Sequence, residues 1–567
     1  MWRQRLITVL LAAVWIALAG RLIQIQWLDQ ERFSARASRQ RLFDETILAR
    51  PGDLYDRHGR LLATTTQSQS LFVDPSLVDD PAGVAQQLAA ALTLDPQPLA
   101  DRLQQAHERR FLWIKRRLSA AETAAVRALE LPRAVWGFRP EYVRHYPQGP
   151  LAAHVLGLRD IDGVGRGGVE EWFDDRLRGT NGRRQLVRDA RGYVLDVQDD
   201  AAEPAVPGSS MTLTIDSVIQ LFVERELDAA MDEWRPTSAC AIVIDPQTGD
   251  VLALASRPGF DPNHTADVAE NAWINTAIAS TFEPGSTFKP SIVAWGLEHG
   301  AITTDEAFDC ERGSYRMGGR ILHDHHPYGQ LDVAGILIKS SNIGMAKIGE
   351  RLGNADLHAA AAAFGYGRRT GIELPGELPG LLRPLAEWTS YSTGSIPMGQ
   401  EVSATPLQVL VSLATLANGG RAITPHLLHG TSGTEPLARN IVTKRVVGEA
   451  TAAWIVQSAL VGVVERGTGQ QARIKDLSVF GKSGTAQKFD AATGQYSKSR
   501  YVSSFACGAP AEAPRAVVLV SINEPTAGPS YYGGTVAAPT ATAILKRTLA
   551  IIDAGDELTS SPEAPRR

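Results

Sequence analysis

The strongest apolar pattern in the chain lies at its N-terminus. Behind two arginines, an uncharged apolar run extends from Leu6 to Gly20, and apolar residues recur beyond it as far as Leu28. Such a segment enters a membrane, either as the core of a cleaved signal peptide or as a spanning helix. Ala17 to Ala19 resembles a cleavage site, whereas the later apolar positions and an interfacial Trp27 favour an uncleaved anchor with a cytoplasmic N-terminus.

A second region of regular pattern starts at Met211. Met211 to Ile215 alternates with the period of a strand, Val218 to Trp234 has helical spacing, and Ala239 to Asp245 predicts another strand. Near the C-terminal end, Arg515 to Ile522 predicts an apolar strand and Pro539 to Ile552 predicts a helix. This mixture predicts a separate α/β domain.

The region between these two shows short apolar runs among many charges and turn residues, without a concentrated catalytic cluster. It is typical of an irregular α+β pedestal, and the polar C-terminal residues are typical of a disordered tail. The predicted divisions are an anchor at 1–28, a pedestal at 29–210, a catalytic domain at 211–552 and a tail at 553–567.

Composition narrows the function only slightly. With 44% apolar and 21% charged residues the chain is typical of a globular protein, and a formal charge of −5 gives no reason to expect nucleic acid as a partner. The three cysteines, Cys240, Cys310 and Cys507, form no CxxC pair. This excludes a disulfide framework and favours buried free thiols over a single disulfide.

One serine lies in a strong catalytic pattern. Ser286 and Lys289 form the only S-x-x-K in the chain. Because Pro290 is tolerated only in the first turn of a helix, a helix must begin close to Ser286. Lys289 then projects from the same face and can act as a base, while the positive end of the helix dipole favours an oxyanion beside the serine.

Two further motifs complete this pattern. A lysine acts as a base if burial and a second positive charge lower its pKa, and Lys482, in Gly481 to Thr485, can supply that charge beside an exposed strand. Ser340 to Asn342 lies on a helix predicted from the apolar spacing of Ile336 to Ile348. A second S-x-N, Ser521 to Asn523, lies inside an apolar strand and is interpreted as structural.

The order of these motifs is shared by penicillin-binding proteins and serine β-lactamases. From its anchor to about residue 550, the chain resembles class B penicillin-binding proteins, the monofunctional D,D-transpeptidases. Arg50 to Ala63 is similar to the family's R-G-x-I-x-D-R-x-G-x-x-L-A segment, except that Pro51 is inserted after the arginine. Other similar segments are Arg144 to Pro147, Ala153 to Gly157, Gly168 to Glu170, Thr212 to Asp216, Asp245 to Gly249, Asp261 to Asn263, Tyr532 to Gly534 and Ala537 to Pro539.

The resemblance implies an α+β fold with a single N-terminal transmembrane helix, an elongated pedestal domain, and a transpeptidase domain in which helices flank an antiparallel sheet. It places the protein in the cytoplasmic (inner) membrane, with the catalytic domain in the periplasm or extracytoplasmic space. We expect no cofactor and no metal.

The resemblance also implies a role for each motif residue. Ser286 would attack the carbonyl between the two terminal D-alanines of a stem peptide, and Lys289 would accept its proton, giving an acyl-enzyme. Ser340 would relay a proton to the departing D-alanine, Asn342 would bind the amide of the donor peptide, and Lys482 would set the local potential.

Substrate binding is expected along Ser483, Gly484 and Thr485. The hydroxyls of Ser483 and Thr485 would grip the terminal carboxylate, and the oxyanion would lie between the backbone NH groups of Ser286 and Thr485. The implied ligands are peptidoglycan stem peptides ending in D-Ala-D-Ala, and β-lactams as mimics that acylate Ser286.

Within the family, Gly467 to Gly469 and Met398 to Gln400, followed by Thr405 to Gln408, are more similar to the septal, cell-division type than to the elongation type. Implied partners are the membrane, a glycan polymerase of the SEDS kind, and other division or envelope proteins.

Several other functions fit parts of the sequence: an elongation-type transpeptidase, a D,D-carboxypeptidase, a β-lactamase and a catalytically idle envelope scaffold. A β-lactamase needs a group that activates water, for which we find no signature. The complete motifs argue against an idle scaffold.

His323 to His326, together with Cys310, could form a zinc site. Adjacent histidines on a loop point in different directions, however, which disfavours such a site.

Overall fold

The computed structural model describes residues 1–33, 42–188, 194–431, 444–490 and 493–560. The chain forms two compact units, each drawn from separate stretches of sequence. The first unit combines residues 1–52, 67–143 and 178–209, and the second combines residues 53–66, 144–177 and 210–567. Residues 53–66 and 144–177, which the sequence analysis placed in the pedestal, thus lie in the second unit.

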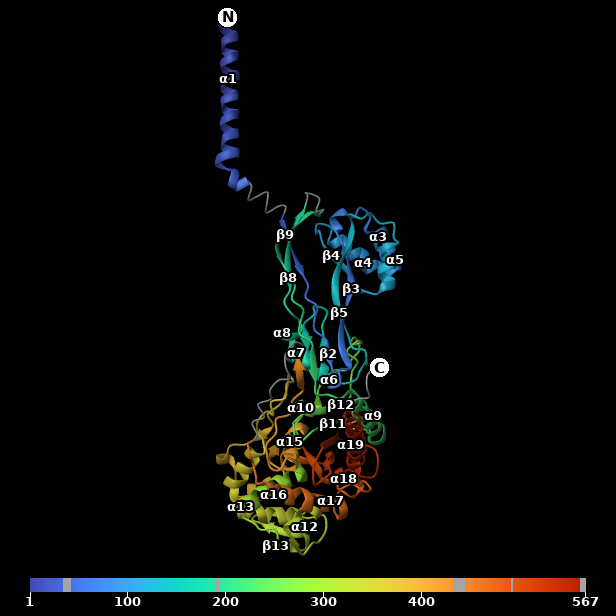
Figure 1. The fold of residues 1–567 in the computed structure, drawn as a ribbon, viewed down its shortest axis with the longest axis vertical. Helices are drawn as coiled ribbons and strands as arrows, with labels where there is room; N and C mark the ends of the chain where they lie inside the picture. Colours follow the sequence, from blue (N-terminus) through green and yellow to red (C-terminus); the bar gives the residue numbers. More distant parts are fainter. Residues whose placement is uncertain (34–41, 189–193, 432–443, 491–492, 561–567) are drawn as a thin grey trace. The chain divides into compact units, whose positions relative to one another are not determined.

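The first unit begins with a long apolar helix. Helix α1 (Trp2–Ile23) continues into a π-helical turn, η1 (Gln24–Leu28), and none of their side chains is buried. Within the described residues, this is the one helix long and apolar enough to cross a membrane. It includes the whole apolar run found in the sequence (Figure 1).

The remainder of the first unit combines strands and helices. Strands β1 (Leu42–Ile47), β8 (Gly182–Arg188) and β9 (Val194–Glu203) form an antiparallel sheet in the order β1-β8-β9. The C-terminal part of β3 (Leu61–Val73) pairs with β4 (Leu112–Leu118). Side chains of Asp80, Asp95 and Ser119 cap helices α3 (Pro81–Leu92), α4 (Pro96–Gln105) and α5 (Ala120–Arg127).

The second unit is built on a five-stranded antiparallel sheet, which confirms the expected fold class. Its order is β12-β11-β22-β21-β20, so β20 is an edge strand. The strands predicted from residues 239–245 and 515–522 are observed within one residue of those bounds. The bounds are β11 (Ser238–Ile244), β12 (Val251–Arg257), β20 (Phe480–Asp490), β21 (Gln495–Ala509) and β22 (Ala516–Asn523).

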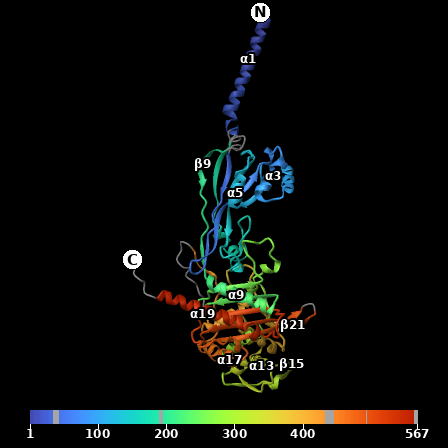
Figure 2. The same cartoon turned by 90° about the vertical axis from the view of Figure 1, so that its right-hand side faces the viewer.

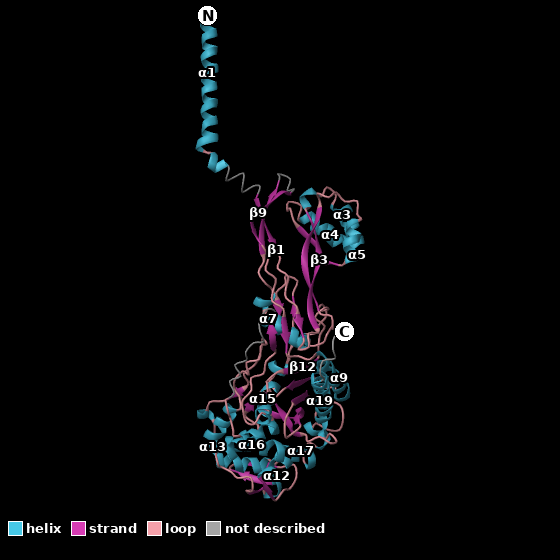
Figure 3. Ribbon diagram, viewed as in Figure 1, coloured by secondary structure: helices cyan, strands magenta, loops and turns pink. Residues whose placement is uncertain are grey.

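Helices cover both faces of this sheet. Successive strand residues point to opposite faces, and apolar side chains on each face pack against helices. Helices α9 (Ser217–Trp234) and α19 (Ala538–Ser560) pack on one face with Ala241 and Val243 (Figure 2), and α19 runs past its expected end at Ile552. Ile242 and Ile244 belong to the larger core on the other face. That core includes helix α11 (Lys289–Glu298). It also includes α12 (Val333–Lys339), α13 (Asn342–Ala363) and α15 (Pro406–Ala417), which Figure 3 labels.

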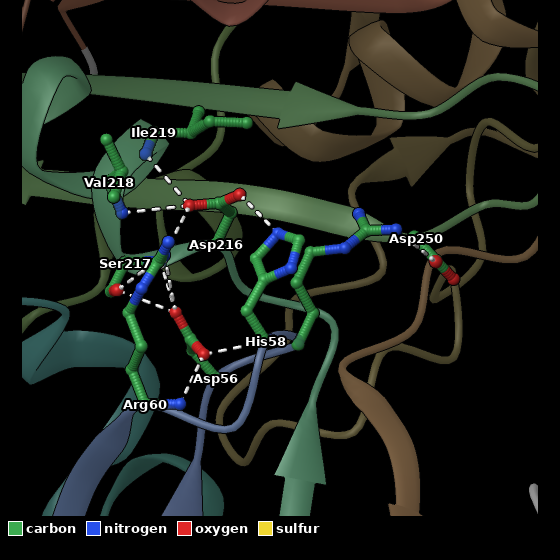
Figure 4. Close-up of polar contacts among 9 residues, drawn as sticks. Asp56, His58, Arg60, Asp216, Ser217, Val218, Ile219 and Asp250 are labelled. Atoms are coloured by element: carbon green, nitrogen blue, oxygen red, sulfur yellow. Dashed lines mark hydrogen bonds and ion pairs between the residues drawn. The ribbon is translucent and has the colours of Figure 1, made fainter. Parts of the chain in front are cut away.

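A buried aspartate ties the segment around residues 53–66 to helix α9. Asp56 is fully buried and accepts hydrogen bonds from the backbone NH groups of His58 and Arg60 at 2.9 and 2.8 Å. Its other oxygen accepts from the backbone and hydroxyl of Ser217, at the start of α9, while Asp216 caps the helix (Figure 4). These bonds explain why this early segment folds with the second unit.

A buried ion cluster holds residues 144–177 together. Glu170 is fully buried and accepts from Arg144 Nε at 2.6 Å and from Arg159 Nε at 2.7 Å. Arg144 lies in a segment that resembles the family, and Arg159 lies close to another. Both arginines therefore contribute to the packing of this region.

The three cysteines are buried and free, as predicted.

Candidate active site

The turn that carries Ser286 is a short 3₁₀ helix, η4 (Gly285–Phe288), that leads directly into α11. A helix therefore begins close to Ser286, as Pro290 predicted. Gly285 has a φ of +54° and donates its NH to the carbonyl of Gly399 at 3.1 Å. A Cβ on Gly399 would lie 2.2 Å from the Gly285 carbonyl oxygen, so this glycine permits the close approach that braces the turn.

The Ser340 to Asn342 motif lies at a break between two helices, and the single helix predicted from the apolar spacing is wrong. Helix α12 ends at Lys339, Ser340 adopts a left-handed conformation with a φ of +58°, and α13 starts at Asn342. Ser341 caps α13 by accepting from Gly344 NH at 2.9 Å. The break turns the carbonyl of Ser340 toward Lys289 and its hydroxyl toward both Lys289 and Lys482.

Lys289 is fully buried in a shell of oxygen atoms from this junction. Its Nζ donates to the carbonyl of Ser340 at 2.7 Å, to the carbonyl of Ser341 at 3.3 Å and to Asn342 Oδ1 at 2.9 Å. These bonds compensate part of the cost of burying an ammonium group. They also fix the side-chain amide of Asn342.

One hydroxyl connects the three groups expected to carry the chemistry. Ser340 Oγ donates to Ser286 Oγ at 2.9 Å and accepts from Lys289 Nζ at 3.2 Å and Lys482 Nζ at 3.0 Å. The described hydrogen bonds thus join Lys289 to Ser286 through Ser340. From the sequence, a direct contact between Lys289 and Ser286 was expected.

Both lysines have lowered pKa values. Burial lowers the pKa of Lys289 from 10.5 to about 7, although the charge of Asp324 acts in the opposite direction. Burial, and then repulsion from Lys289, lowers the pKa of Lys482 well below its usual value. The sequence predicted that burial and the charge of Lys482 together lower the pKa of Lys289, and burial is the cause found. A pKa of about 7 leaves part of Lys289 as a neutral amine beside Ser340 near neutral pH.

Asp324 organises the break between α12 and α13. It accepts from the hydroxyl of Ser341 at 2.6 Å and from the backbone NH of Ile343 at 3.1 Å. Asn342 Nδ2 also donates to the carbonyl of His323 at 3.1 Å. The segment considered above for zinc thus positions the S-x-N motif, and the part of the chain that is described contains no cluster of metal-ligating side chains.

Ser483 and Thr485 lie on the edge strand β20, and each is held by a hydrogen bond to a different neighbouring segment. Ser483 Oγ lies 2.8 Å from Thr468 Oγ1, and Thr485 Oγ1 accepts from Gly533 NH at 3.0 Å. A Cβ on Gly484 would lie 2.4 Å from the hydroxyl of Ser504. Packing within the protein therefore requires this glycine, a reason that the motif alone did not reveal.

These motifs meet at one cavity of about 780 Å³. Its wall includes Ser286, Ser340, Asn342, Ser483 and Thr485, whereas Lys289 and Lys482 are buried behind it. Four tyrosines and two histidines contribute further to the wall: Tyr328, Tyr501, Tyr531, Tyr532, His325 and His326. The arrangement provides a hydroxyl nucleophile, amines of low pKa and a peptide-sized space beside an open strand edge.

Two family models match consecutive parts of this chain. Residues 46–213 match the penicillin-binding protein dimerisation domain, and residues 239–546 match the penicillin-binding protein transpeptidase domain. The chain is a class B penicillin-binding protein. Its second unit therefore carries a peptidoglycan D,D-transpeptidase, and the first unit contains most of the dimerisation, or pedestal, domain.

Relatives of this class B penicillin-binding protein include a sporulation protein and a D,D-transpeptidase. Stage V sporulation protein D of Bacillus subtilis is 33% identical over 96% of this chain and 85% of its own length. Peptidoglycan D,D-transpeptidase FtsI of Escherichia coli is 30% identical over 96% of this chain and 91% of its own. Penicillin-binding protein 3 of Mycobacterium tuberculosis, solved in complex with aztreonam, has a TM-score of 0.69 and 27% identity, covering 92% and 98% of the two chains. Such identities define the class without choosing a subtype.

Sequence reasoning missed the supports of the site in this class B penicillin-binding protein. Thr468 was noticed only as part of a subtype signature, and Asp324 only as an imagined zinc ligand. Both residues contact motif side chains that are distant in sequence. In the sequence, each of them stands out only as part of a short motif, Gly467 to Gly469 or His323 to His326.

Proposed function

We propose that this class B penicillin-binding protein cross-links stem peptides through an acyl-enzyme on Ser286, in septal wall synthesis. The observation that carries the proposal is the hydrogen-bonded path from Ser286 through Ser340 to two buried lysines of lowered pKa. Such a path can remove the proton of a serine hydroxyl, which is otherwise a poor nucleophile.

Acylation begins when the hydroxyl of Ser340 reverses its direction. A neutral Lys289 accepts the Ser340 proton, and Ser340 in turn accepts the proton of Ser286. Ser286 Oγ bonds to the carbonyl carbon between the two D-alanines, and the peptide C–N bond breaks. The proton held by Lys289 then passes back through Ser340 to the departing D-alanine nitrogen, so that the charges balance.

The donor peptide lies along β20 in this proposal. Ser483 and Thr485 hydrogen-bond its terminal carboxylate, and Asn342 bonds its amide. The oxyanion accepts from the backbone NH groups of Ser286 and Thr485. Losing one such donor typically costs about 3 to 4 kcal/mol of transition-state stabilisation.

The second half of the reaction regenerates the enzyme. An amine from a neighbouring stem peptide attacks the ester carbonyl, a new C–N bond forms, and Ser286 leaves with a proton. β-Lactams acylate Ser286 as substrate mimics in this proposal, consistent with the aztreonam complex of the Mycobacterium tuberculosis relative.

The cellular part of the proposal rests on α1 and on the subtype motifs. Helix α1 would anchor the protein once in the cytoplasmic membrane, with both catalytic and pedestal domains outside it. A SEDS-type glycan polymerase and other division proteins would bind the helix and the pedestal. The Gly467 to Gly469 segment, which supports Ser483 through Thr468, favours the septal role.

Covalent labelling with a fluorescent penicillin tests the core of the proposal. The wild-type protein should be labelled, and Ser286→Ala should not be, while its thermal unfolding is unchanged. Undiminished labelling of Ser286→Ala would refute the nucleophile. Product analysis with a donor peptide, with and without an acceptor amine, separates transpeptidation from carboxypeptidase activity, and depletion of the protein tests the septal role.

A further inference from the structure

A second cavity adjoins the catalytic one. It has a volume of about 770 Å³ and lies where β20 and β21 extend beyond the catalytic motifs. Three residues line both cavities: Glu283, Ala486 and Gln487. Glu283, three positions before Ser286 in the sequence, is the charged residue among these three.

The carboxylate of Glu283 is held firmly by neutral donors. Its Oε1 accepts from the backbone NH of Glu401 at 2.9 Å and from the hydroxyl of Tyr496 at 2.8 Å. Across the described residues, its Oε2 takes part in no hydrogen bond or ion pair. The orientation of the group is therefore fixed while one oxygen remains available for a ligand.

Other charged groups of the second cavity are paired. Arg383 pairs with Glu401, and Lys488 pairs with Glu524 at 2.5 Å. Glu283, by contrast, has no cationic partner among the described residues, and burial raises its pKa. A partly buried carboxylate without a counter-ion costs free energy, which a cationic ligand would recover.

We propose that the second cavity binds the acceptor strand and that Glu283 pairs with the ammonium group of the acceptor stem peptide. This inference rests on the proposed transpeptidation. A stem peptide that offers a side-chain amine is cationic near neutral pH. The position of Glu283, on the wall of both cavities, holds that group next to the acyl-enzyme.

The same carboxylate prepares the amine for reaction. The ammonium group gives one proton to Glu283 and becomes a free amine. Its nitrogen bonds to the acyl carbon, the ester C–O bond to Ser286 breaks, and Ser286 Oγ takes a proton from the attacking nitrogen. Glu283 later releases its proton to solvent, so the step needs no further reactant.

Glu283→Gln tests the proposal because the amide oxygen still accepts from Glu401 and Tyr496 while the charge is lost. The full-length protein would be acylated with a thioester analogue of the donor peptide. Two nucleophiles then compete: a stem peptide with a free side-chain amine, and hydroxylamine, which is neutral at pH 7. We expect the ratio of transfer to the peptide over transfer to hydroxylamine to fall about tenfold in Glu283→Gln.

Two controls separate the effect of the Glu283 charge from a general effect of losing a carboxylate: a matched variant and added salt. Glu350→Gln removes an exposed carboxylate of α13, outside both cavities, and should leave the ratio unchanged. Added salt should lower the ratio in the wild type and not in Glu283→Gln. An unchanged ratio in Glu283→Gln, or an equal loss of both transfers, would overturn the inference and leave a structural role. If the acylated wild type transfers to hydroxylamine but never to the peptide, transpeptidation itself fails.

Discussion

Asp324 Oδ2 accepts a hydrogen bond from the hydroxyl of Ser341 at 2.6 Å, and the same carboxylate raises the pKa of Lys289 against the effect of burial. One side chain thus positions the S-x-N motif and raises the pKa of the lysine that this motif surrounds. The two effects can be separated, because one depends on hydrogen-bond acceptors and the other on charge.

Asp324→Asn should shift the pH dependence of acylation. The charge of Asp324 favours the ammonium form of Lys289, so its removal lowers the pKa of Lys289 further below about 7. The acylation rate with penicillin should then reach its plateau at a lower pH, with a plateau about tenfold lower because the Ser341 hydroxyl loses its acceptor. Asp305→Asn, an exposed control, should keep the wild-type profile. A midpoint that does not move would contradict the electrostatic role.

Lys289→Arg should acylate far more slowly than the wild type. Lys289 must be neutral to accept a proton, so wild-type acylation should rise as the pH increases through about 7 and then level off. Arginine stays charged at all these pH values, and loss of a general base typically costs 10²- to 10⁴-fold, so we expect a fall of at least about a hundredfold. Stopped-flow acylation kinetics measure this, with Lys347→Arg on α13 as the control. Wild-type rates in Lys289→Arg would refute the base role.

Glu170→Gln should destabilise the second unit. It removes the negative charge that two buried arginines, Arg144 and Arg159, share at 2.6 and 2.7 Å. Breaking a buried ion pair in this way typically costs about 3 to 5 kcal/mol of unfolding free energy. Urea unfolding of purified protein would show the loss, and the exposed neighbour Glu171→Gln should change stability by far less. Equal stability of the two variants would mean that the cluster adds nothing.

The mature protein should retain α1. The helix continues through Ala19 to Ile23 without a break, and η1 extends it to Leu28. N-terminal sequencing of the membrane-extracted protein should therefore start near Met1, with Arg3 and Arg5 on the cytoplasmic side. A chain that starts at Gly20 would show that the segment is a signal peptide.

The chemistry of the site could be predicted because its motifs are local. Pro290 restricts where a helix can start, so the position of Ser286 followed from backbone geometry. The break at Ser340 could not be predicted, because apolar residues on either side keep the spacing of one continuous helix. It depends on Asp324, a residue outside the motif whose contacts form only in the folded chain.

Strands and helices of the second unit were predicted well where their apolar periods are strong, as in β11 and α9. The division of the chain into two units could not be predicted from the sequence in the same way. Residues 53–66 and 144–177 carry no periodic signal that links them to the rest of the second unit, from residue 210 onward. Their membership depends on single buried groups, such as Asp56 and Glu224, which accepts from the backbone NH of Ala152 at 2.7 Å.

The contact between Asp56 and Ser217 also restricts how genes for such proteins can recombine. A single crossover near residue 210 would join one parent's Asp56 segment to another parent's catalytic domain, across hydrogen bonds at 3.2 and 2.6 Å. Exchanges that keep residues 53–66, 144–177 and 210 onward from one parent preserve these bonds. Viable mosaics should therefore inherit these three stretches together, or exchange shorter blocks inside one of them.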